Sequence, residues 1–133
     1  MERLEWTVQY SVGVPKIDQQ HAHLFDLANR LAKHVSKSED AEITAHTIKE
    51  VHKYVEDHFA FEESIMQRAG YEHLELHRKM HDLMRTRLDL LTAQLKQGLL
   101  SRAELVEFME TWLTEHIIME DMRYILAVSK LPQ

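Results

Sequence analysis

The sequence has no cysteine, only three glycines and two prolines, and few aromatic residues among its 133 positions. Without cysteine the chain forms no disulfide framework, no thiolate metal site and no cysteine nucleophile. So few glycines and prolines argue against an all-β fold, whose many turns would need more of them. No apolar run approaches the length of a transmembrane helix, and the polar start of the chain does not resemble a signal peptide. We therefore expect a cytoplasmic protein without a membrane anchor.

Basic clusters are also missing, and the charge balance is acidic. The sequence contains 16 Lys and Arg against 22 Asp and Glu, so its formal net charge is −6. This balance makes nucleic acid and anionic membrane unsuitable partners. The length suits a single domain over residues 1–133, and a hydrophobic fraction of 44% is typical of a globular protein with a core. One count is unusual, because the chain contains ten histidines.

The N-terminal segment, residues 1–17, lacks the periodicity of a helix. It contains Gly13, Pro15 and a β-rich run at 7–10, so we expect an extended arm that lies on the domain. Asp18 is placed to cap the helix that follows. The arm should therefore end where the first helix begins.

Apolar residues recur every three or four positions through the remainder of the chain, which is the pattern of helices with one buried face. Gly70 and Gly98 stand where glycines end helices, and Ser101 with Glu104 has the spacing of a capping box. Long helices with short breaks between them make antiparallel neighbours. The predicted fold class is therefore all-α, an antiparallel up-down-up-down four-helix bundle with an extended N-terminal arm. The expected helices cover about 18–36, 41–68, 72–97 and 101–128.

Imidazole occupies the inward face of every predicted helix, where leucine or valine would be expected. A buried polar group without a partner costs roughly 1–3 kcal/mol. A single buried histidine is usually satisfied by a neighbour, but one core cannot easily supply separate partners for five of them. A shared cation would satisfy them all. The residues are His21, His58, His77, His81 and His116, and Glu62 adds a carboxylate one turn after His58.

Two of the spacings suit metal ligation. His58 with Glu62, and His77 with His81, are four residues apart and so lie on one face of a helix. In an antiparallel bundle all the inward histidines fall at the same end. Imidazole and carboxylate without thiolate suit iron, zinc, copper or manganese, and the number of ligands exceeds what one ion needs. A pair of metal ions bridged by carboxylates accounts for that number.

Helical spacing leaves the role of Asp121 open. It follows His116 by five residues, about 140° round a regular helix. Both reach one centre only from opposite flanks, or if the helix is locally distorted. Taken alone, Asp121 reads as a surface carboxylate, as does Glu63 beside Glu62.

These residues resemble the pattern of the hemerythrin family, and within it the stand-alone bacteriohemerythrins. The resemblance runs from about residue 6 to 124 and includes Ile17–His21, His58–Glu63, His77–His81 and Trp112–Asp121. All seven positions that hold iron in that family carry the expected residue types. The resemblance implies two iron ions (Fe2+/Fe3+) with a bridging oxide or hydroxide. It assigns His77, His81 and His116 to one ion and His21 and His58 to the other, with Glu62 and Asp121 bridging.

The function that the resemblance implies is reversible dioxygen binding at a non-haem di-iron centre, for oxygen storage, delivery or sensing. An oxygen-consuming enzyme is then a candidate partner. A site rich in neutral imidazole favours holding dioxygen over oxidising a substrate, so we expect no enzyme, apart from weak secondary redox activity. The chain also lacks the Glu-x-x-His motif of ferritin-like di-iron proteins. In the family, the residues that line the oxygen pocket correspond to Phe59, Trp112, Leu113 and Ile117.

Two alternatives stay open on the sequence. One is a di-iron enzyme acting on peroxide, nitric oxide or oxygen, or an iron-handling or repair protein. The other is an interaction module whose metal site is structural. The histidines away from the inward faces are expected on the surface and serve as controls: His23, His34, His46, His52 and His73.

Overall fold

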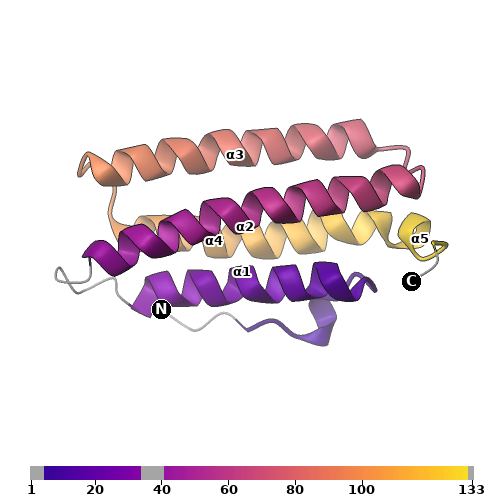
Figure 1. The fold of residues 1–133 in the computed structure, drawn as a ribbon, viewed down its shortest axis with the longest axis horizontal. Coiled ribbons are helices and arrows are strands. Elements are labelled where there is room, and N and C mark those ends of the chain that lie inside the picture. Colours follow the sequence, from indigo (N-terminus) through magenta and orange to yellow (C-terminus); the bar gives the residue numbers. More distant parts are fainter. Residues whose placement is uncertain (1–4, 34–40, 132–133) are drawn as a thin grey trace.

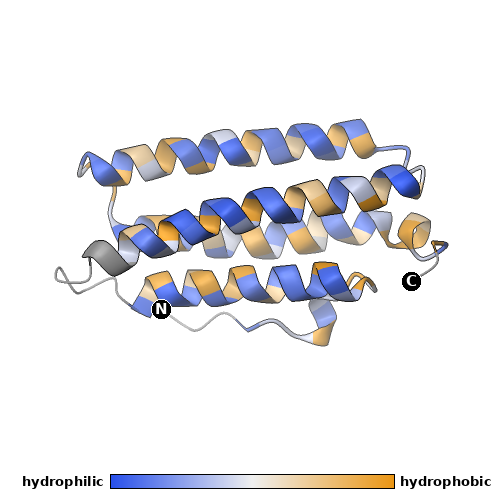
Figure 2. Cartoon of the chain, viewed as in Figure 1, coloured by the Kyte–Doolittle hydropathy of each residue, from blue (hydrophilic) through white to orange (hydrophobic). Residues whose placement is uncertain are grey.

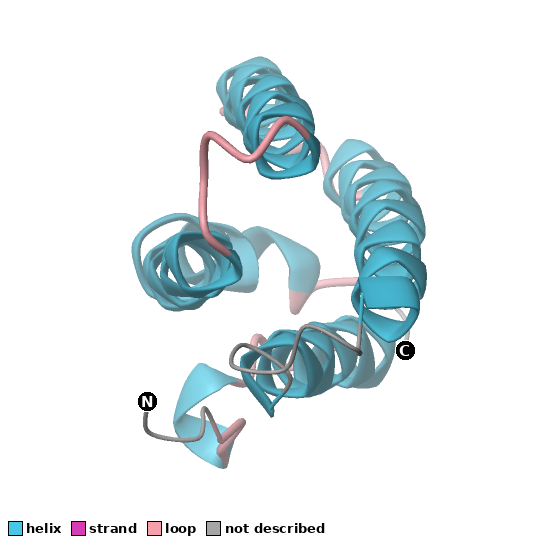
Figure 3. Ribbon diagram, turned by 90° about the vertical axis from the view of Figure 1, so that its left-hand side faces the viewer, coloured by secondary structure: helices cyan, strands magenta, loops and turns pink. Residues whose placement is uncertain are grey.

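The computed structural model describes residues 5–33 and 41–131, and within them it contains helices and no strand. Long helices run side by side along one axis (Figure 1), and the end-on view shows them arranged around a common centre (Figure 3). The predicted all-α antiparallel bundle is confirmed. The four long helices are α1 (Pro15–Lys33), α2 (Ala41–Arg68), α3 (Leu74–Lys96) and α4 (Arg102–Glu115).

The helices bury apolar faces against one another, and Figure 2 shows hydrophobic and hydrophilic residues alternating around each of them. The larger apolar cluster joins the four long helices and includes Phe25, Phe59 and Leu113. A smaller cluster at one end joins the N-terminal segment and the start of α1 to α2 and the turns after α4, and it includes Val12, Ile17 and Tyr124. None of the described helices is both long and apolar enough to cross a bilayer.

The N-terminal segment is largely the predicted arm, but it contains a short helical turn and ends earlier than predicted. The run Val8–Tyr10 forms a turn of 3-10 helix, and α1 begins at Pro15, three residues before Asp18. Proline is favoured at the first helical position because its fixed φ suits the helix and its missing N–H would be unpaired there. Asp18 instead secures the arm, since its carboxylate accepts from the Ser11 hydroxyl at 2.6 Å and from the Val12 N–H at 2.9 Å.

The breaks after α2 and α3 lie at the glycines and the capping box that the sequence predicts. Gly70 and Gly98 follow α2 and α3 with φ of 66° and 76°, a backbone conformation that favours glycine. Ser101 and Glu104 form the expected capping box. The predicted end of the first helix at 36 lies outside the described residues.

The fourth helix is interrupted, whereas a continuous helix over 101–128 was predicted. The regular part ends at Glu115, and a π-helical turn (His116–Glu120) and a 3-10 turn (Asp121–Tyr124) precede the short α5 (Ile125–Val128). Neither glycine nor proline stands in this stretch, so no sequence signal marks the change. The interruption lies where the predicted ligands of this helix stand.

Candidate metal centre

Seven buried side chains from α1, α2, α3 and the π-helical and 3-10 turns after α4 meet at one end of the bundle. Each is at most 4% exposed. Their ligand atoms form two overlapping groups, each within 4.8 Å, that share Glu62 and His116. All seven predicted ligand residues are thus brought together: His21, His58, Glu62, His77, His81, His116 and Asp121.

The Glu62 carboxylate lies between two sets of imidazoles. Its Oε1 is 2.9 Å from the Nε2 atoms of both His77 and His81. Its Oε2 is 3.3 Å from Nε2 of His58 and accepts a hydrogen bond of 3.0 Å from the Tyr124 hydroxyl. One oxygen therefore faces the α3 histidines and the other faces the histidine of α2.

Asp121 divides its oxygens in the same way. Its Oδ1 lies 3.0 Å from Nε2 of His116 and 3.1 Å from Nε2 of His77. Its Oδ2 lies 3.0 Å from Nε2 of His21 on α1. Each carboxylate thus presents one oxygen to each set of imidazoles, an arrangement that can bridge two cations.

The π-helical turn explains how Asp121 reaches the cluster. The backbone N–H of Asp121 bonds to the carbonyl of His116, five residues earlier, as well as to that of Ile117. A π turn holds one more residue than an α turn, so residues five apart lie on the same side of the helix. Asp121 is therefore buried beside His116 and is not a surface carboxylate.

The π turn is equivalent to a regular α-helical turn with one residue inserted. Deleting one residue from it should therefore restore a regular α-helix. We expect deletion of Met119, whose side chain is exposed, to give a regular turn that keeps Asp121 beside His116 and keeps metal binding. Deletion of the exposed Thr111 within α4 rotates the following residues by about 100° and should abolish binding. Metal content by elemental analysis, with circular dichroism to check folding, distinguishes the two. Equal loss in both variants would contradict this role of the π turn.

The outward nitrogens of three rings are held by polar side chains. Gln20 accepts from Nδ1 of His58 at 2.8 Å, and Glu63 accepts from Nδ1 of His81 at 2.7 Å. Glu120 lies 3.4 Å from Nδ1 of His116. Such bonds fix the ring orientation, so that Nε2 points inward as a metal ligand requires.

Glu63 was expected to be solvated, and this expectation is wrong, since its side chain is only 18% exposed and bonded to His81. The partners Gln20, Glu63, Glu120 and Tyr124 were not identified from the sequence. Gln20 directly precedes the predicted ligand His21, and Glu63 directly follows Glu62. The periodicity of one helix does not show which residues of a neighbouring helix these side chains contact.

The cluster side chains shift one another's pKa values. Burial by itself would raise the pKa of Glu62, but the imidazoles of His58 and His116 help to hold it well below its ordinary value. Burial would likewise raise the pKa of Asp121, yet His116 lowers it. Burial opposes protonation of His77, but the neighbouring carboxylates of Asp121 and Glu62 raise its pKa to about 9. Both carboxylates are therefore ionised, as ligands of a cation are.

Protein partners do not satisfy all of these groups. Among the described residues, neither oxygen of Asp121 completes a hydrogen bond, and Nε2 of His116 also completes none, although this nitrogen and Oδ1 of Asp121 are 3.0 Å apart. The Nε2 atoms of His21 and His58 also lie 3.0 Å apart, and only one hydrogen fits between them. Each unsatisfied buried group costs roughly 1–3 kcal/mol. Nitrogen and oxygen atoms held this close, with too few hydrogen bonds among them, fit a metal site, and imidazole and carboxylate ligands of this kind suit iron.

Aromatic and aliphatic side chains enclose the cluster. The ring of Phe59 stacks on His81 with centroids 3.8 Å apart and 8° between the planes. Trp112 stacks on His116 at 4.9 Å and 13°. Leu113 and Ile117 are completely buried. Of the four residues predicted to line an oxygen pocket, Phe59, Leu113 and Ile117 lie in the core, and Trp112 is partly buried and packs against it. Phe59 and Trp112 lie directly against cluster histidines.

Comparisons with known proteins agree with this geometry. The family profile described as Hemerythrin HHE cation binding domain matches residues 12–127. A bacteriohemerythrin of Pseudomonas aeruginosa is 34% identical over 128 residues, which cover 96% of this chain and 83% of that protein. A myohemerythrin of Theromyzon tessulatum is 28% identical and covers 92% of both chains. The crystal structure of wild-type hemerythrin superimposes with a TM-score of 0.87 at 26% identity, covering 96% of this chain and 99% of that one. The chain belongs to the hemerythrin family.

Proposed function

We propose that this protein binds dioxygen reversibly at two iron ions bridged by an oxide or hydroxide. The observation that carries the proposal is the division of both carboxylates, each with one oxygen toward His77 or His116 and the other toward His21 or His58. Two cations account for ligand atoms that face two separate sets of imidazoles, whereas a single cation would not need both sets. The assigned ligands are His77, His81 and His116 for one ion, His21 and His58 for the other, and Glu62 and Asp121 as bridges.

Bound ferrous iron would supply the electrons for reversible capture of dioxygen. The chain supplies the surroundings. Gln20 and Glu63 hold the rings of His58 and His81 with Nε2 inward, and the Tyr124 hydroxyl holds one oxygen of Glu62. Ligands held in this way need not reorganise when a small gas molecule arrives.

The apolar enclosure keeps water out. Phe59, Leu113 and Ile117 are completely buried, and Trp112 covers the face of His116. We infer that these four side chains line the space for dioxygen. An apolar wall would admit a neutral gas molecule, and it excludes water, the proton donor that would otherwise reach the site. Storage, delivery to an oxygen-consuming enzyme and sensing all use this same reversible step.

The proposal is tested by adding ferrous iron under argon, admitting air and then purging with argon. We expect two iron ions per chain by elemental analysis. We also expect a visible absorption band that forms in air and disappears on purging, over repeated cycles. Protein loaded with zinc is the matched control and should show no band, because zinc has no redox chemistry.

Other outcomes would change the function. Continued oxygen consumption with no lasting band would indicate a di-iron enzyme. Iron-loaded protein without any response to oxygen would indicate a structural metal site. One iron ion per chain would contradict the bridged pair while leaving the family membership intact.

A further inference from the structure

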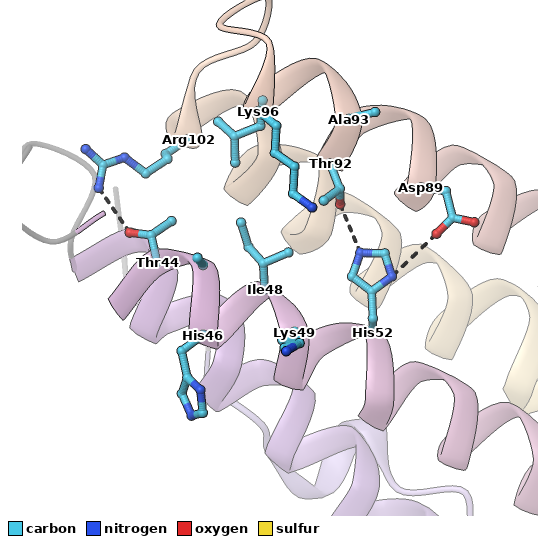
Figure 4. Close-up of a pocket in the computed structure, with 12 residues that line it drawn as sticks. Thr44, His46, Ile48, Lys49, His52, Asp89, Thr92, Ala93, Lys96 and Arg102 are labelled. Atoms are coloured by element: carbon cyan, nitrogen blue, oxygen red, sulfur yellow. Dashed lines mark hydrogen bonds and ion pairs between the residues drawn. The ribbon is translucent and has the colours of Figure 1, made fainter. Parts of the chain in front are cut away.

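A groove lies between α2 and α3 at the end of the bundle away from the metal cluster. Its volume is about 1080 Å³. At one end Arg102, at the start of α4, donates to the hydroxyl of Thr44 at 3.0 Å. At the other end His52 bonds the Thr92 hydroxyl at 2.9 Å (Figure 4). The two cross-links are eight residues apart on α2, which is about 12 Å at a rise of 1.5 Å per residue.

The sequence leaves this space open because small residues stand where the two helices face each other. Ala45 on α2 and Ala93 on α3 line the groove, and both are exposed. Ile48 and Leu95 add larger apolar surface. The lining is therefore mostly apolar, and it is long enough for a short aliphatic chain.

The same groove carries positive charge on a chain of net charge −6. Its lining includes Lys49, Lys96 and Arg102 against one carboxylate, that of Asp89. Figure 4 shows the Lys96 side chain reaching into the space beside Ile48. Within the part of the chain that the structure describes, neither lysine forms an ion pair or hydrogen bond.

From this combination we propose that the groove binds a small aliphatic carboxylate, a medium-chain fatty acid. The chain of the ligand lies along Ile48 and Leu95, and its carboxylate meets Lys49 and Lys96. A carboxylate with two ammonium groups forms charge-assisted hydrogen bonds, which are stronger than neutral ones. The site is separate from the metal cluster, because none of the seven cluster residues lines it.

The test is calorimetric titration of octanoate into the iron-loaded protein. We expect saturable binding of one octanoate per chain. The double variant Lys49→Gln/Lys96→Gln should bind at least about tenfold more weakly, a loss of about 1.4 kcal/mol. The matched control Lys53→Gln/Lys79→Gln also removes one lysine from α2 and one from α3, both exposed and outside the lining, and should bind as the unaltered protein does.

Two further measurements separate charge from apolar contact. Ala93→Leu fills the groove with a side chain that helices favour, and should abolish octanoate binding while the circular dichroism spectrum is unchanged. Octanol should bind at least about tenfold more weakly than octanoate. Equal binding of octanol, or unchanged octanoate binding in both groove variants, would overturn the proposal. Binding to phosphatidylglycerol vesicles without binding of octanoate would also overturn it and assign the surface to a membrane.

Discussion

Replacing His77 or His81 with alanine should lower the affinity for iron by more than about 100-fold, because even the loss of a partner outside the ligand set costs about 10–100-fold. Both Nε2 atoms lie 2.9 Å from the same oxygen of Glu62, so either change removes a donor from the same set. Iron per chain after gel filtration, measured by elemental analysis, is the readout. The matched control is His46→Ala, since the His46 side chain is 73% exposed, and it should retain full iron content.

His81→Ala also removes the ring that stacks on Phe59 and leaves a cavity, so lost iron could follow from lost packing. His81→Phe separates the two causes, because it keeps an aromatic ring of similar shape but offers no nitrogen donor. We expect His81→Phe to lose iron as His81→Ala does, with a folded circular dichroism spectrum. Retention of iron by His81→Phe, or loss of iron by His46→Ala, would contradict the assignment of the ligands.

The histidine cluster was predictable because helical periodicity and antiparallel order are both properties of the sequence. His58 with Glu62, and His77 with His81, share a face at a spacing of four in any regular helix. Their common depth follows once the helices alternate in direction. The sequence therefore predicts not only the bundle but also which of its ends carries the polar cluster.

Asp121 and Glu63 show where this reasoning stops. A regular helix turns Asp121 away from His116, and only the π turn, which neither glycine nor proline marks, brings it back. The resemblance to hemerythrins favoured Asp121 as a ligand, but it does not explain how the Asp121 side chain reaches the cluster. The burial and contacts of Glu63 depend on how α2 is rotated against α3, since its partners His81 and Arg78 both belong to α3. Contacts between helices leave no repeating pattern in the sequence of either helix, so periodicity does not predict them.

The start of the first helix was predicted wrongly for a different reason. Asp18 is a residue type that often caps helices, and the residues before it have the pattern of an extended chain. A proline at the first helical position competes with that reading, and Pro15 starts α1. Once the helix begins there, the Asp18 side chain is free to accept hydrogen bonds from Ser11 and Val12. Local propensity alone does not decide between these two uses of one carboxylate.

Removal of iron should lower the melting temperature by at least about 10 °C. A ligand present at about 1,000 times its dissociation constant stabilises the folded state by about 4 kcal/mol. In a domain of this size each kcal/mol shifts the melting temperature by about 3–5 °C. The physical reason is local, because Glu62 and Asp121 are completely buried and the Asp121 oxygens complete no hydrogen bond with atoms of residues 5–33 and 41–131. Thermal unfolding followed by circular dichroism, before and after dialysis against a chelator, measures the shift.

The same experiment on the His77→Ala variant shows where the stabilisation arises. If iron stabilises through this cluster, the chelator should shift the melting temperature of that variant much less than that of the unaltered protein. Zinc should restore most of the lost stability without any response to oxygen, since it accepts the same nitrogen and oxygen ligands but does not change oxidation state. Equal melting temperatures with and without metal would mean that no ion lies in the core, because a cation cannot satisfy these buried groups and leave the free energy of unfolding unchanged.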